Sequence, residues 1–181
     1  MIRPETRPPA SRVVGIDPGM SETGWAVLDQ EPGASPRLVA SGLVRTAAGT
    51  PLPRRLREIH EAVSAVLREH RPGAVAVEEM FFLVAATSVR SSLQARGVIL
   101  LAAEESGADV REYNPRQVKS ALTGNGAAAK PQVMRMTARA LGLAEVLRPD
   151  DVSDAAAIAI THLRAASRGR LKVMERIGGG R

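Results

Sequence analysis

Three short apolar runs lie in the first 45 residues, and they constrain the fold of the chain more than any other feature. Residues 12–17 are rich in β-branched side chains and end at Pro18-Gly19, residues 23–28 follow after a short turn, and residues 38–45 form the third run. Runs of this length, bounded by Pro, Gly and Ser, are typical of strands. Because consecutive strands joined by short loops pair antiparallel, the pattern predicts an antiparallel meander.

The periodicity then changes from that of strands to that of helices. From Leu52 to His70, apolar residues recur at helical spacing, which predicts an amphipathic helix. The later segments predict strands at 74–78 and 108–113, and helices at 91–105, 115–122, about 130–141 and about 150–166. The order βββαβαβ followed by helices predicts an α/β fold with a mixed five-stranded sheet, three strands antiparallel and the later ones parallel, flanked by helices. This order is characteristic of the ribonuclease-H-like architecture.

Length and composition indicate a single domain. The chain has 181 residues, of which 44% are hydrophobic, as expected for one globular core. Residues 1–11 are rich in proline, and residues 167–181 are basic and end in a run of glycines before Arg181. We therefore expect mobile tails at 1–11 and 167–181 around a domain at 12–166.

Two absences in the sequence narrow the class of protein. The chain has no cysteine, which excludes disulfides and thiolate zinc sites. No apolar run approaches the roughly 20 residues that cross a bilayer, and the start Met1-Ile2-Arg3-Pro4 lacks the apolar stretch of a signal peptide. We expect a cytoplasmic protein.

The positive charge is concentrated at the two ends of the chain. The net charge is +6, and the arginines and lysine before Val13 and after Ser167 account for all of it, so the segment between is neutral overall. Within that segment, however, residues 111–139 carry one acid, Glu112, against six basic residues: Arg111, Arg116, Lys119, Lys130, Arg135 and Arg139. This local stretch is better evidence for a polyanionic partner than the total charge.

Two carboxylates follow apolar strands directly. Asp17 ends the first predicted strand, and Glu78 ends the fourth. The carboxyl ends of strands face the crevice in which ligands bind in α/β folds, so both are candidates for a site. Each also has an ordinary explanation: Asp17 can form a turn before Pro18-Gly19, and Glu78 can be a solvated strand end.

A second pair of carboxylates lies at the start of the last predicted helix. Asp151 and Asp154 are three residues apart and therefore share a face of its first turn. Acids are also common helix caps, which explains Asp150 or Asp151 without a function. The helix that follows, residues 155–160, is apolar on every side and must be buried, so its first turn should lie at the end of the core.

Acids gathered from several elements at one rim would repel one another unless cations neutralise them. Mg²⁺ or Mn²⁺ suits carboxylate oxygens and leaves positions for water and phosphate. Two such ions about 4 Å apart can align an in-line displacement at phosphorus, one activating water and the other stabilising the leaving oxygen. No phosphate-binding loop of the form GxxxxGK[ST] is present.

Five segments carry a resemblance that extends over residues 12–165. They are Gly15-Ile16-Asp17-Pro18-Gly19 with Thr23-Gly24, Val77-Glu78-Glu79-Met80-Phe81, Gln94-Ala95-Arg96-Gly97-Val98, Arg116-Gln117-Val118-Lys119, and Asp151-Val152-Ser153-Asp154-Ala155 continuing to Ala159-Ile160-Thr161-His162. In this order they resemble the motifs of the RuvC family of Holliday-junction resolvases. Met20 stands where the family usually has a small polar residue, and Trp25 where Tyr is common.

The resemblance implies a structure-selective endonuclease of DNA recombination and repair. Such an enzyme is a homodimer that binds a four-way junction and nicks two strands of like polarity symmetrically, leaving 5′-phosphates and 3′-hydroxyls. It implies a dimer interface that includes the helix containing Gln94 to Leu101. The RuvA-RuvB branch-migration complex is the partner that the resemblance implies.

The resemblance also implies roles for individual residues. The residues that match the catalytic, metal-binding positions, with two Mg²⁺ or Mn²⁺ ions per site, are Asp17, Glu78, Asp151 and Asp154. The residues that match DNA-binding positions are Phe81, Arg116, Lys119 and Lys130. Core packing is the ordinary explanation for Phe81, and a solvated helix face is that for Lys119.

Two other classes of protein remain as alternatives. An actin-like or sugar-kinase-like ATPase also opens with a strand, an Asp and glycines, but it needs a second phosphate-binding half that 181 residues hold with difficulty. A non-catalytic junction-binding protein could keep the same fold. The presence of all four acids argues against that alternative.

Overall fold

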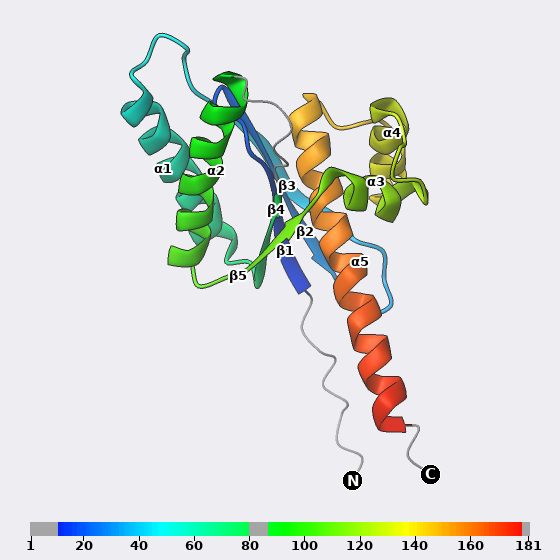
Figure 1. Ribbon diagram of the computed structural model, residues 1–181. Helices are drawn as coiled ribbons and strands as arrows, with labels where there is room; N and C mark the ends of the chain where they lie inside the picture. Colours follow the sequence, from blue (N-terminus) through cyan, green and yellow to red (C-terminus); the bar gives the residue numbers. More distant parts are fainter. Residues whose placement is uncertain (1–10, 80–86, 179–181) are drawn as a thin grey trace.

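A computed structural model describes residues 11–79 and 87–178 of the chain (Figure 1). Its centre is a five-stranded sheet made of β1 (Ser11–Asp17), β2 (Glu22–Gln30), β3 (Arg37–Arg45), β4 (Ala74–Glu78) and β5 (Asp109–Tyr113), in the order β3-β2-β1-β4-β5. β1 and β3 both pair antiparallel with β2, whereas β4 runs parallel to β1 and β5 parallel to β4. The predicted mixed sheet is therefore confirmed.

The helices form a layer on each face of the sheet. α1 (Leu52–His70) and α2 (Thr87–Glu105) lie together on one face, and α5 (Asp150–Gly178) crosses the other, with α3 (Pro115–Thr123) and α4 (Lys130–Ala140) beside it (Figure 1). None of the described helices is both long and apolar enough to cross a membrane.

The largest difference from the predicted boundaries is at the end of the last helix. The last helix was expected to end near Ala166, but α5 continues to Gly178 and so includes residues assigned to the C-terminal tail. Apart from Gly169 and the terminal Gly178, residues 167–178 contain many good helix formers, such as Arg, Leu, Lys, Met and Glu, and no proline. The charge of this segment suggested a tail, but its helix propensity is sufficient to prolong α5.

The alternation of side chains along β1 divides the core into two. Val14 and Ile16 point toward α1 and α2, where they pack with residues such as Ile59 and Ile99. Val13 points to the opposite face and joins the cluster that contains Ile158 of α5. Gly15 shares this second face, and a Cβ placed on it would lie 2.1 Å from the carbonyl oxygen of Ala155. Only glycine therefore allows α5 to lie this close to β1.

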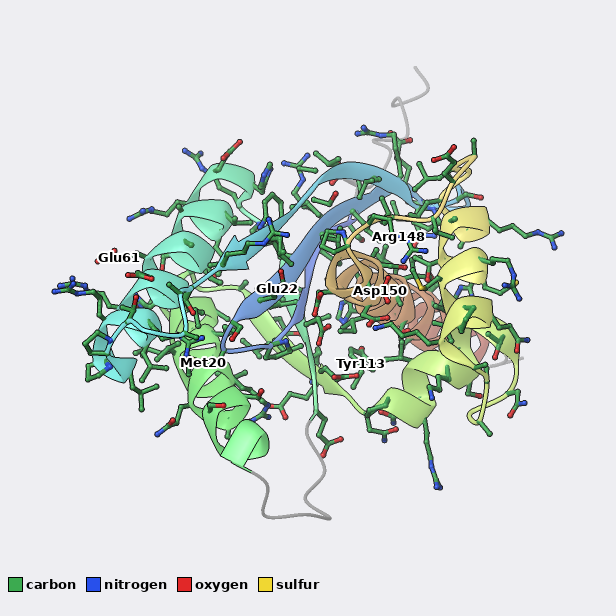
Figure 2. All side chains as sticks on the ribbon, turned by 90° about the horizontal axis from the view of Figure 1, so that it is seen from above. Met20, Glu22, Glu61, Tyr113, Arg148 and Asp150 are labelled. Atoms are coloured by element: carbon green, nitrogen blue, oxygen red, sulfur yellow. The ribbon has the colours of Figure 1, made fainter. Side chains whose placement is uncertain are left out.

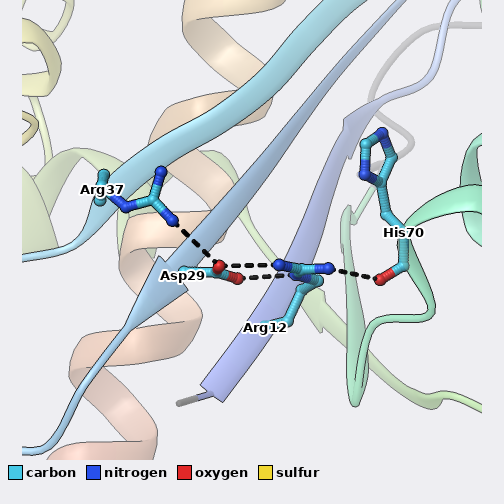
Figure 3. A network of polar contacts seen from close by, with 4 residues as sticks. All are labelled: Arg12, Asp29, Arg37 and His70. Carbon is cyan, nitrogen blue, oxygen red and sulfur yellow. Dashed lines mark hydrogen bonds and ion pairs between the residues drawn. The ribbon is translucent and has the colours of Figure 1, made fainter.

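A charged network holds the end of the sheet at which β1 begins (Figure 3). The Arg12 guanidinium donates to both carboxylate oxygens of Asp29 on β2, at 2.7 and 2.8 Å, and to the backbone carbonyl of His70 at 3.1 Å. Arg37 adds a longer contact with Asp29, at 3.4 Å. The network links β1, β2, β3 and the end of α1.

Candidate active site

Strand alternation places Asp17 and Glu78 on the same side of the sheet. Asp17 is two residues beyond Gly15, and Glu78 is two beyond Ala76, which packs in the cluster beneath α5. β1 and β4 are parallel neighbours, with Ile16 paired to Val77. Both carboxylates therefore lie at the carboxyl ends of adjacent strands, on the face that α5 covers.

The turn after Asp17 is fixed by Thr23. Its hydroxyl donates to the backbone carbonyl of Gly19 at 2.6 Å, and the side chain is fully buried. Met20 is also buried, at 5% exposure, and packs in the cluster under α1 and α2. The unusual apolar residue in this turn is thus explained by packing against that cluster.

Asp151 and Asp154 reach the same rim from the first turn of α5. A Cβ on Gly24 would lie 2.1 Å from the carbonyl oxygen of Asp151, so α5 begins in direct contact with β2. Gly24 is in turn the residue paired with Asp17 across β1 and β2. The first turn of α5 is thereby held next to Asp17.

The carboxylates of the rim influence one another electrostatically. Burial raises the pKa of Asp17 well above its usual range, and the neighbouring charges of Glu78, Asp154 and Asp151 raise it further. Burial also raises the pKa of Glu78 and of Asp154, with the charge of Asp154 adding to the effect on Glu78. Such mutual influence requires proximity, so the structure brings the four predicted acids together at one rim.

Lys130 supplies positive charge to this rim. It is the first residue of α4, and its ammonium lies 3.0 Å from Oδ2 of Asp154 and 3.5 Å from Oδ2 of Asp150. Arg148 also pairs with Asp150, at 2.6 Å. Figure 2, which looks down on this end of the sheet, shows Arg148 and Asp150 beside the start of α5. Asp150, expected only as a helix cap, is therefore a further acid of the site, and its pairing with α4 had no signal in the sequence.

A pocket of about 160 Å³ opens beside the rim between α3, α4 and α5. Its polar lining consists of Glu78 and Asp154 together with Lys119 and Lys130, and Val118, Val133 and Ile158 supply apolar walls. Carboxylates and lysines in the lining of one pocket suit a ligand that carries both a cation and an anionic oxygen.

The other predicted DNA-binding residues are placed differently. Lys119 lies on α3 and lines the pocket, whereas Arg116, one turn earlier on the same helix, is exposed and absent from the pocket lining. Phe81 lies outside the described residues. The basic stretch predicted around residues 111–139 thus reaches the rim chiefly through Lys119 and Lys130.

His162 contributes a contact further along α5. Its Nδ1 lies 3.0 Å from the hydroxyl of Tyr113, the last residue of β5, and burial lowers the pKa of the imidazole. The pair joins α5 to the sheet two turns beyond Asp154. This contact gives His162 a structural role in joining α5 to β5.

The donor chemistry of the rim fits a hard divalent cation. Carboxylate oxygens are the ligands that Mg²⁺ and Mn²⁺ prefer, and the raised pKa values of Asp17, Glu78 and Asp154 mean that added positive charge would stabilise their ionised forms. The acids are not yet arranged as a complete set of metal ligands. In residues 11–79 and 87–178, no group of three His, Asp or Glu side chains is positioned to hold a metal ion. In this arrangement the ammonium of Lys130 forms an ion pair with the carboxylate of Asp154.

The sheet order, the helical layers and the position of the acids define the ribonuclease-H-like class of fold. The family profile described as crossover junction endodeoxyribonuclease RuvC matches residues 13–162. The chain therefore belongs to the RuvC family. The relative from Brevibacillus brevis is 49% identical over 83% of this chain and 90% of its own length, and that from Rubrobacter xylanophilus is 47% identical over 83% of each. Both are named crossover junction endodeoxyribonuclease RuvC.

Solved structures agree with this assignment. RuvC of Thermus thermophilus in complex with a Holliday junction substrate is 42% identical, covers 88% of this chain and 96% of its own, and superposes with a TM-score of 0.83. The yeast mitochondrial Holliday junction resolvase Ydc2 has a TM-score of 0.67 at 14% identity, covering 93% of this chain and 85% of its own. At that identity the second likeness shows the fold alone.

Proposed function

We propose that this protein is a structure-selective endonuclease that resolves four-way DNA junctions in recombination and repair. The observation that carries the proposal is the convergence of Asp17, Glu78, Asp151 and Asp154 at one rim, beside a pocket that also exposes two lysines. Membership of the RuvC family supports the substrate, since a relative at 42% identity is described with a Holliday junction.

Nucleases of this family are metal-dependent. We assign the metal-binding role to the four carboxylates and propose two Mg²⁺ or Mn²⁺ ions per site. When bound, such ions activate water for attack on phosphorus and stabilise the leaving 3′-oxygen. No nucleophilic side chain is then needed, and the products carry 5′-phosphates and 3′-hydroxyls.

The chain's own residues prepare the site for this chemistry. The close packing of α5 on β1 and β2 fixes the backbone of Asp151 and Asp154 relative to Asp17 before substrate binds. Lys119 and Lys130 line the pocket and are placed to neutralise a DNA phosphate that approaches the acids. We assign weaker contacts with the DNA backbone to Arg116, and stacking on junction bases to Phe81.

The proposal includes an assembly and a location. Two symmetric nicks require two active sites, so we propose a homodimer whose interface includes the helix containing Gln94 to Leu101. We also propose coupling to a RuvA-RuvB branch-migration complex and action in the cytoplasm, where such a complex meets chromosomal DNA.

A nicking assay tests the proposal. A labelled four-way junction and a linear duplex of the same arm sequence are incubated with the protein in Mg²⁺, in Mn²⁺ and in EDTA. We expect paired nicks in the junction, ends that ligase can seal, and no cutting in EDTA or of the linear duplex. Asp17→Asn should bind the junction and leave it intact. Equal cutting of duplex and junction, or full activity of Asp17→Asn, would overturn the proposal, and metal-independent binding without nicking would indicate a junction-binding protein.

A further inference from the structure

Of the two lysines that line the pocket, Lys130 is the one that forms an ion pair with a carboxylate of the rim. Its Nζ atom lies 3.0 Å from Oδ2 of Asp154, one of the four proposed metal ligands. Lys119 lines the same pocket but forms no ion pair within 4.0 Å among the residues that the structure describes. The two lysines therefore differ in what they contact, although they carry the same charge.

The ion pair between Lys130 and Asp154 is exposed enough for another cation to replace the ammonium. The Lys130 side chain is 51% exposed and that of Asp154 is 30% exposed, so water can replace either partner. A partly exposed ion pair of this kind is weak, and the lysine has a long flexible stem. A divalent cation carries twice the charge and would displace the ammonium from a shared carboxylate.

Asp150 gives the displaced ammonium another partner. It lies 3.5 Å from the Lys130 ammonium and is not among the four proposed metal ligands. Asp150 is also paired with Arg148, so its charge is compensated whether or not Lys130 stays. Asp154 has no second basic partner of this kind among the described residues. Its charge is left for a cation whenever Lys130 leaves.

We propose that Lys130 and the divalent metal compete for Asp154, so that Lys130 sets the metal affinity of the DNA-free protein. This inference rests on the proposed function, because it takes Asp154 as a metal ligand. Metal loading then frees the Lys130 ammonium to pair with Asp150 alone, or with a phosphate that enters the pocket it shares with Lys119. A DNA phosphate there would hold the ammonium away from Asp154, so metal and DNA should each strengthen the binding of the other.

Calorimetric titration of Mg²⁺ into the DNA-free protein tests this competition. We expect Lys130→Met to bind Mg²⁺ about three- to tenfold more tightly than the unaltered protein, which is the range that loss of a partly exposed ion pair gives. Lys130→Arg keeps the charge and should bind like the unaltered protein. Lys119→Met removes the same charge from the same pocket without removing an ion pair, so its affinity should change less.

Equal tightening in Lys119→Met and Lys130→Met would overturn the inference, because it would show a general effect of pocket charge. Unchanged affinity in Lys130→Met would also overturn it while leaving the proposed nuclease intact. Failure of every variant, and of the unaltered protein, to bind Mg²⁺ would instead contradict the proposed metal site itself. The circular dichroism spectrum of each variant in EDTA verifies that it is folded.

A second measurement uses the unaltered protein and does not depend on any variant. Lys119, Lys130 and Lys172 are the chain's lysines, so ¹³C-dimethylation of the lysine amines gives few NMR signals, and the amines keep their charge. Adding Mg²⁺ without DNA should shift the Lys130 signal most, that of Lys119 less, and that of Lys172 not at all. A saturating Mg²⁺ titration that leaves the Lys130 signal in place would overturn the inference.

Discussion

Gly24 of β2 lies directly beneath the backbone of Asp151 at the start of α5. A Cβ at position 24 would stand 2.1 Å from the Asp151 carbonyl oxygen and 2.9 Å from the amide nitrogen of Val152. No side-chain rotation relieves such a contact, because both atoms belong to the helix backbone. The absence of a side chain at Gly24 thus determines how closely the acids of α5 approach Asp17.

Gly24→Ala should therefore damage both the fold and the site. We expect the start of α5 to move away from β2, which lowers the free energy of unfolding by about 1–3 kcal/mol, as for other overpacked positions. The same displacement should weaken Mg²⁺ binding, since Asp151 and Asp154 move away from Asp17. Urea denaturation and Mg²⁺ calorimetry measure the two effects.

Gly49→Ala is a matched control, because a Cβ at Gly49 meets nothing within 4 Å. Its free energy of unfolding should stay within about 0.5 kcal/mol of the unaltered protein, with Mg²⁺ affinity unchanged. A Gly24→Ala variant that behaved like Gly49→Ala would contradict the positioning role of this glycine.

Asp17→Asn should separate stability from activity. The pKa of Asp17 is raised by burial and by its acidic neighbours, so its ionised form opposes folding at neutral pH. The amide has the same shape without the charge, and we expect the metal-free variant to unfold at higher urea than the unaltered protein. Its junction-nicking rate should fall on the order of 10³-fold or more. A variant that lost stability in EDTA would contradict the cost assigned to this charge.

Much of the fold could be predicted because it depends on local patterns. The change from alternation to helical periodicity after residue 45 gave the order of strands and helices, and the predicted bounds of α1 agree with the structure. The end of α5 was missed because positive charge suggested a tail where the chain continues as a helix. Charge alone does not end a helix that lacks proline.

The site could be predicted only in part, because its acids come from local motifs but its neutralising contacts do not. Asp17 and Glu78 end apolar strands, a feature visible in the sequence. The pairing of Lys130 with Asp154 and Asp150 depends on how α4 packs beside α5, which no local spacing encodes. The close approach of α5 at Gly15 and Gly24 is likewise a tertiary relationship.

The acidic rim should give the metal-free protein an unusual pH dependence. Asp17, Glu78 and Asp154 have folded-state pKa values raised above those of the unfolded chain, so the folded state binds more protons. Their contribution to stability is complete below the unfolded pKa, about 4, and is lost as pH rises through the raised values. In EDTA, urea denaturation from about pH 8 down to pH 5 should therefore show this contribution increasing as pH falls.

Glu78→Gln provides the comparison for that experiment. The variant should show a weaker gain in stability on acidification than the unaltered protein, because one of the three titrating groups is absent. Saturating Mg²⁺ should reverse the trend in the unaltered protein, since metal binds the ionised carboxylates and is lost as they take up protons. Identical pH profiles for the two proteins in EDTA would contradict the raised pKa of Glu78.

The pair between Arg12 and Asp29 predicts the opposite pH behaviour at the other end of β1. The hydrogen bonds from Arg12 lower the pKa of Asp29, so this contribution to stability is present above about pH 4 and is lost as pH falls through the lowered value. Arg12→Met should cost about 1–2 kcal/mol of unfolding free energy at neutral pH, after allowance for the 37% exposure of the arginine.

Arg37 contacts the same carboxylate at 3.4 Å but is 71% exposed, so Arg37→Met should cost no more than about 0.5 kcal/mol. Equal losses for the two arginines would show that Asp29 responds to nearby charge and not to the two-point contact with Arg12.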